Sequence, residues 1–106
     1  MLFKKTKMND DEIVVEIEGS LSGDESSREL QAILDEIEAG KQKSIVLNFL
    51  KVPAINSSNL GKLFLFFNRI RGAGRTMKIK GCSETLFKTF QLIEMENHIP
   101  YQRDAN

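Results

Sequence analysis

The stretch SIVLNFLKVPAINSSNLG, from Ser44 to Gly61, decides how this chain folds. The segment from Ser44 to Leu50 is an apolar run that only Asn48 breaks. A run of this length is typical of a central strand covered on both faces, although periodicity alone also fits a buried helix segment. Pro53 then ends the regular structure, because proline lacks an N–H and restricts the residue before it.

A helical period begins at Ser57. Asn56, Ser57 and Ser58 are all residue types that favour the N-cap of a helix. The apolar residues that follow recur at helical spacing and form one face: Leu60, Leu63, Phe64, Phe67 and Ile70. The sequence therefore predicts a helix that presents serines directly after a central strand.

The segment upstream predicts a hairpin and then a helix. A strand at 2–7, a turn at 9–11 and a half-buried strand at 13–18 come first, followed by the loop GSLSGD at 19–24. Both 22–25 and 26–29 match a capping box, so a helix should begin between Ser22 and Ser26. Its apolar stripe consists of Leu30, Ile33, Leu34 and Ile37, and Gly40 is expected to end it.

The segment downstream continues the alternation. Gly72 and Gly74 are expected to end the second helix, and a short strand follows at 76–80. A third helix is expected after Ser83, and a last extended segment at 98–102. The order β-β-α-β-α-β-α-β predicts an α/β fold with a mixed, mostly parallel sheet of four to five strands flanked by three to four helices. A chain of 106 residues is expected to form one domain, 1–106.

Charge and composition exclude several classes of function. Residues 1–40 hold eleven acidic and four basic residues, a net −7, and residues 41–106 hold the reverse, a net +7. This asymmetry either steers a charged partner or cancels in the folded chain. The sequence has one cysteine, Cys82, and one histidine, His98, and it lacks phosphate-binding, nucleophile-elbow and zinc-protease motifs. We therefore expect no catalytic residues, no metal, no cofactor, and neither a secretory signal nor a membrane span.

Two further interpretations concern the strand end and Ser57. A receiver domain needs a phosphorylatable aspartate where its third strand ends, but no aspartate lies between Asp35 and Asp104, so we exclude that class. A phosphate on Ser57 would meet the N–H groups and positive dipole of the helix that starts there. The alternative is that Ser57 only caps the helix, because serine is common at that position.

The segment from Ile45 to Ile93 resembles the core of a STAS domain, in particular the anti-sigma-factor antagonists of bacteria. Those proteins carry a strand such as IVLDL or IVLNL, a loop, and then DSSGLG at the start of a helix. Here Ser57, Ser58, Leu60 and Gly61 match that motif, whereas Asn56 replaces its Asp and Asn59 replaces its first Gly. Upstream, VEIEGSLSGDESSREL resembles the entry segment of the family.

The resemblance implies a regulatory protein without catalytic activity. Ser57 would be the phosphorylated residue, with Ser58 as the second choice. The unphosphorylated form would bind an anti-sigma factor or related kinase-fold regulator in the cytoplasm, and a serine phosphatase would restore it. The implied partner-binding residues are Asn56, Ser57, Ser58, Asn59, Gly61 and Leu65. Neither nucleic acid nor membrane is an expected partner, and a homodimer stays open.

The alternative is a STAS scaffold in which Ser57 is never modified. Such a chain would be a subunit of a larger signalling or lipid-transport assembly. The substitutions Asn56 and Asn59 favour this alternative, because they change the motif around the serine.

Overall fold

The computed structural model describes residues 2–81 and 101–102. The elements, in chain order, are β1 (Phe3–Met8), β2 (Glu12–Glu18), α1 (Asp24–Ala39), β3 (Ser44–Lys51), α2 (Ser57–Gly72), β4 (Thr76–Lys80) and β5 (Tyr101–Gln102). Their order through β4 confirms the alternation that the sequence predicts. The expected third helix, Cys82 and His98 lie outside the described residues.

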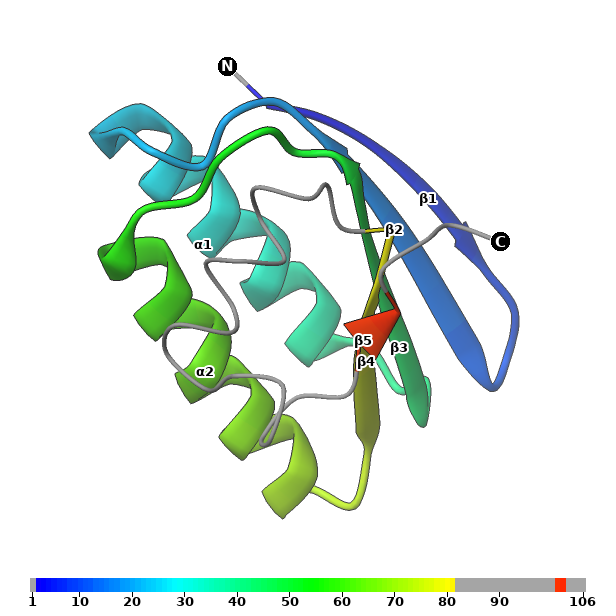
Figure 1. Ribbon diagram of the computed structural model, residues 1–106. Helices are drawn as coiled ribbons and strands as arrows, with labels where there is room; N and C mark the ends of the chain where they lie inside the picture. The colour runs from blue at the N-terminus through cyan, green and yellow to red at the C-terminus, as the bar shows by residue number, and fades with distance from the viewer. Residues whose placement is uncertain (1, 82–100, 103–106) are drawn as a thin grey trace.

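The strands form one sheet in the order β1-β2-β3-β4-β5. β1 pairs antiparallel with β2, and the other neighbouring strands pair in parallel. The apolar strand β3 is central, and the sheet is mixed and mostly parallel, as predicted. The connections β2-α1-β3 and β3-α2-β4 place both described helices on one face of the sheet (Figure 1).

The core lies between that face of the sheet and the two helices. Alternate strand residues point toward the helices because successive side chains of a strand point to opposite faces. The strand residues of the core include Ile13, Val15, Ile17, Ile45, Leu47, Phe49, Met77 and Ile79. The helix residues of the core are Leu30, Ile33, Leu34, Ile37, Leu60, Leu63, Phe66, Phe67 and Ile70.

Two local expectations were wrong. Phe66 is fully buried, whereas Phe64, which was placed on the buried face, is only partly buried. At the start of α1, Gly23 is the N-cap, so neither expected capping box forms. The Ser26 hydroxyl instead accepts a hydrogen bond from the Gly23 N–H at 3.0 Å and donates one to the Gly23 carbonyl at 2.9 Å.

Candidate functional site

Backbone hydrogen bonds join the loop between β3 and α2 to the loop between β2 and α1. The Leu21 N–H donates to the Ala54 carbonyl at 2.8 Å, and the Asn56 N–H donates to the Leu21 carbonyl at 2.9 Å. Leu21 and Ile55 form an isolated parallel bridge, and the Leu21 side chain is fully buried. Figure 1 shows the two loops side by side. The backbone that carries Ser57 is therefore anchored on its N-terminal side.

Asn56 is the N-cap of α2, one of the three residues that the sequence offered for that position, so the alternative that Ser57 only caps the helix was wrong. Its backbone is extended, and its side-chain oxygen accepts a hydrogen bond from the Asn59 N–H at 2.9 Å. Ser57 and Ser58 follow as the first two helical residues, and both are exposed. The first turn carries no acidic residue, so the positive end of the helix dipole faces solvent beside two hydroxyl groups. This end of α2 is a favourable place for an added anion.

Asn59 lies inside the protein. Its side chain is fully buried, and its Nδ2 donates to the Leu21 carbonyl at 2.8 Å. Its Oδ1 is also buried and has no hydrogen-bond partner in the described part of the chain. Asn59 therefore offers no surface to a partner, which corrects the expectation that it contributes to partner binding. Its role in this structure is to tie α2 to the upstream loop.

An exposed stripe runs along α2 from the two serines. Ser58, Gly61 and Leu65 lie three and four residues apart, so they share one side of the helix. The Leu65 side chain is 60% exposed. A Cβ built on Gly61 would meet no atom of the described residues within 4 Å, so their packing does not require a glycine at that position. We call Ser57, Ser58, Gly61 and Leu65 the α2 surface.

The sequence did not point to the serines of the upstream loop. Ser20 and Ser22 flank the buried Leu21, and both are exposed, with their hydroxyl oxygens 2.5 Å apart. Because Leu21 is bonded to Ala54 and Asn56, these serines border the start of α2. The polar composition of GSLSGD predicts a loop there. It does not predict that this loop lies next to the loop between β3 and α2.

A cation at the end of β3 is held by two carboxylates of β2. The Lys51 ammonium lies 3.2 Å from Glu16 and 3.7 Å from Glu18. The hydrogen bond from Lys51 to Glu16 is the main cause of a raised pKa of Lys51, and the charges of the two glutamates add to it. Lys51 therefore keeps its positive charge, and Glu16 and Glu18 balance that charge. We therefore do not count Lys51 among the groups that would attract an anion to Ser57.

Within residues 2–81 and 101–102, no group of three or more histidine, cysteine or acidic residues is arranged to hold a metal ion. None of the helices in this part of the chain is long and apolar enough to span a bilayer. The described site thus consists of the two serine hydroxyl groups, the N-terminal end of α2 and the exposed Leu65 side chain. Such a surface is suited to docking and to modification.

A family model described as the STAS domain matches residues 4–105, and the chain therefore belongs to the STAS family. No curated protein matches the sequence significantly. Among solved structures, the chain is similar to the unphosphorylated form of the anti-sigma factor antagonist SpoIIAA. The TM-score is 0.71 at 21% identity, and the match covers 98% of this chain and 90% of that one.

Two other solved structures show how widely this fold is used. An anti-sigma factor antagonist from Mycobacterium paratuberculosis has a TM-score of 0.85 at 14% identity, over 96% of this chain and 86% of that one. A sulfate transporter family protein from Wolinella succinogenes has a TM-score of 0.71 at 20% identity, over 86% of this chain and 75% of that one. At these identities the likeness concerns the fold.

Proposed function

We propose that this STAS domain is an anti-sigma-factor antagonist that binds an anti-sigma factor or related serine kinase while Ser57 is unmodified. Phosphorylation of Ser57 would release that partner, and a serine phosphatase would restore binding. The observation that carries the proposal is the α2 surface, in which Ser57 and Ser58 are exposed at an open helix end beside Gly61 and Leu65. The mechanism takes place in the cytoplasm and requires no catalysis by this chain.

The docking step rests on the shape of the α2 surface. Gly61 has no side chain and lies within the first two turns of α2, so the backbone of a partner can approach the helix closely there. The exposed Leu65 then supplies apolar area that is removed from water when the partner binds. Both features lie beyond the anchored loop, so docking needs little reordering of the backbone that carries Ser57.

The switching step rests on charge. A phosphate adds about −1.5 to −2 charges at neutral pH. In the free protein this charge meets the positive end of α2, where the first turn holds no carboxylate. The fold therefore tolerates the modification. In the complex the same charge would be removed from water against a surface that fits a neutral hydroxyl, so the complex dissociates.

The second candidate function is an unmodified STAS scaffold in a larger assembly. Two observations favour it. Asn56 leaves no carboxylate next to Ser57, and its side-chain oxygen is already engaged with the Asn59 N–H. In addition, a sulfate transporter family protein shares the fold. In this function the α2 surface would bind its partner permanently.

The test is an intact-mass measurement of the protein purified from its own host, beside the variants Ser57→Ala and Ser58→Ala. We expect a phosphate-sized shift in the wild type and in Ser58→Ala, and none in Ser57→Ala. Proteins that co-purify should be enriched with Ser57→Ala and depleted with Ser57→Asp. A shift that persists in Ser57→Ala and disappears in Ser58→Ala would move the site by one residue. An unmodified wild type under several growth conditions would favour the scaffold.

A further inference from the structure

Strand β1 forms an open edge of the sheet. It pairs with β2 on one side, and no other strand of residues 2–81 and 101–102 lies next to it in the sheet. All six of its residues are exposed, including Phe3 at 61% and Met8 at 65%. An exposed strand edge offers unpaired backbone N–H and C=O groups, which is the feature that strand addition uses.

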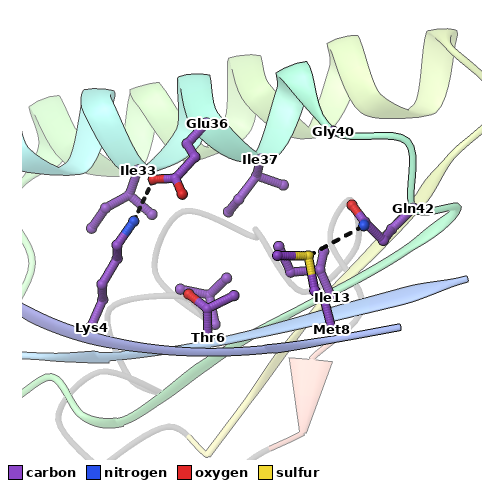
Figure 2. A pocket seen from close by; sticks show the side chains of 10 residues that line it. Lys4, Thr6, Met8, Ile13, Ile33, Glu36, Ile37, Gly40 and Gln42 are labelled. Carbon is purple, nitrogen blue, oxygen red and sulfur yellow. Dashed lines mark hydrogen bonds and ion pairs between the residues drawn. The ribbon is translucent and has the colours of Figure 1, made fainter. Parts of the chain in front are cut away.

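A cavity of about 110 Å³ lies along this edge, between β1 and α1. Figure 2 shows Thr6 and Ile13 on the sheet side and Ile33 and Ile37 on the helix side. The ion pair between Lys4 and Glu36 crosses one end of it. Gln42 Nε2 approaches the Met8 sulfur at 3.5 Å at the other end. An apolar cavity of about 150 Å³ holds one benzene molecule. The cavity beside β1 is somewhat smaller, so it has room for about one aliphatic side chain.

We propose that β1 is a docking edge for an extended acidic segment of another protein, which adds to the sheet beside β1. Alternate side chains of an added strand point to the two faces of the sheet. An aliphatic side chain on the helix face would enter the cavity beside Thr6. Acidic side chains on the opposite face would lie beside Lys5 and Lys7.

The charges of β1 select this occupant. Lys5 and Lys7 are exposed and form no ion pair within the described part of the chain. Lys5 lies opposite Glu16, but Glu16 is already engaged by Lys51 at 3.2 Å. The charge of both lysines is therefore available to an acidic neighbour. Cross-strand pairs of opposite charge stabilise a sheet, and like charges destabilise it.

The same lysines disfavour a second copy of this chain as the occupant of the edge. In a symmetric antiparallel pair of β1 strands, residues that share a face lie opposite each other. Such a pair is centred on a residue that meets its own copy. Centring on Lys4, Lys5 or Lys7 sets that lysine against itself, and centring on Thr6 sets Lys5 against Lys7. Each of these four registers places like charges opposite each other. The other two centres, Phe3 and Met8, are the end residues of β1 and pair only the end of the strand, so β1 resists extensive self-pairing while it remains open to an acidic strand.

The test is titration of the full chain with a capped synthetic peptide of eight residues that alternates glutamate with valine and has one central leucine. Binding is followed by backbone amide NMR and calorimetry. We expect the largest shifts at residues 3–8 and 33–37. The double variant Lys5→Glu/Lys7→Glu should weaken binding by about tenfold or more and should instead bind the same peptide with lysine in place of glutamate. Its matched control is Lys41→Glu/Lys43→Glu, which changes two exposed lysines outside β1 and should bind like the wild type.

Several results would overturn the proposal. The wild type could fail to bind the glutamate peptide, or its NMR shifts could cluster away from β1. The two double variants could bind the glutamate peptide with equal affinity, or the free protein could self-associate in a way that Lys5→Glu/Lys7→Glu alters. Ser57→Ala should bind the peptide like the wild type, because the edge uses none of the α2 surface. The docking edge therefore stands or falls independently of the function proposed for Ser57.

Discussion

At the scale of single residues, Asn59 is the motif residue whose side chain joins α2 to the loop between β2 and α1. Its Nδ2 donates to a carbonyl 38 residues away, on Leu21, which also accepts from the Asn56 N–H. Asn59→Asp replaces that donor with a carboxylate oxygen facing a carbonyl, in a fully buried place. We expect a loss of about 3 kcal/mol in the free energy of unfolding at pH 7, because breaking a buried polar contact and leaving an unpaired charge are both costly.

Urea unfolding at pH 7 measures this loss. The matched control is Asn68→Asp, the same change at an exposed position of the same helix, which should stay within about 0.5 kcal/mol of the wild type. Amide exchange at Leu21 and Asn56 should accelerate only in Asn59→Asp. A variant as stable as Asn68→Asp would contradict the assigned role of Asn59.

The sequence narrowed the cap of α2 to Asn56, Ser57 or Ser58 but did not predict the role of Asn59, for a physical reason. A cap is a local contact, and Asn56 accepts from the N–H three residues ahead, so residue type and position limit the cap to a few neighbouring residues. The bond from Asn59 to Leu21 depends on where a distant loop lies, which only the packed structure determines. For the same reason the exposed serines could be predicted at the start of a helix, but their neighbours Ser20 and Ser22 could not.

At the scale of secondary-structure elements, α2 shows a glycine that its own fold does not need. Gly61→Ala should stabilise the chain by about 0.5–1 kcal/mol, because glycine within a helix is unfavourable relative to alanine and the new Cβ meets no atom within 4 Å among the residues that the structure describes. Under the proposed function the same methyl group would obstruct the partner and weaken co-purification. Thermal unfolding and partner capture should therefore move in opposite directions.

Gly72→Ala is the control for this prediction. Gly72 is the last residue of α2, and a Cβ there also meets no atom within 4 Å in residues 2–81 and 101–102. It should change stability in the same direction, by less, and leave partner capture unchanged. If Gly61→Ala captured partners as well as the wild type, the α2 surface would not extend to Gly61.

The elements themselves were mostly predictable, and the failures have specific causes. Alternation identified β2 because its inward and outward residues differ so clearly, and helical spacing identified the inner face of α1. On α2, all five residues at 63–67 are phenylalanine or leucine, which leaves the buried face ambiguous, so Phe66 was missed. At α1, a run of serines and carboxylates offered several caps, and backbone geometry selected Gly23.

At the scale of the whole molecule, the two oppositely charged portions of the chain meet. Three of the four ion pairs in the described residues join an acid of residues 1–40 to a base beyond residue 40. These pairs are Lys51 with Glu16, Lys51 with Glu18, and Arg69 with Glu38. The structure thus favours cancellation of the charge asymmetry within the fold. Because the side chains of all four pairs are at least partly exposed to solvent, each pair is expected to contribute only about 0–1 kcal/mol to stability.

Arg75, just before β4, joins that strand to the end of α1 and to the loop that follows α1. Its guanidinium donates to three backbone carbonyls: Ile37 at 3.1 Å, Glu38 at 3.2 Å and Gln42 at 2.6 Å. It therefore satisfies the end of α1 and fixes the following loop against the start of β4. Lysine cannot replace this planar fork of donors. We expect Arg75→Lys to lose about 2 kcal/mol in the free energy of unfolding, as for hydrogen bonds that involve a charged group.

The comparison that tests this role is Arg75→Lys beside Arg69→Lys, measured by urea unfolding at low and high salt. Arg69 makes one exposed ion pair with Glu38, so its replacement should cost less than about 1 kcal/mol and should matter less as salt rises. The loss in Arg75→Lys should persist at high salt, because its acceptors are uncharged carbonyls and the side chain is half-buried. Equal losses in the two variants would mean that Arg75 acts as a surface charge, and that packing of the core alone holds α1 against β4.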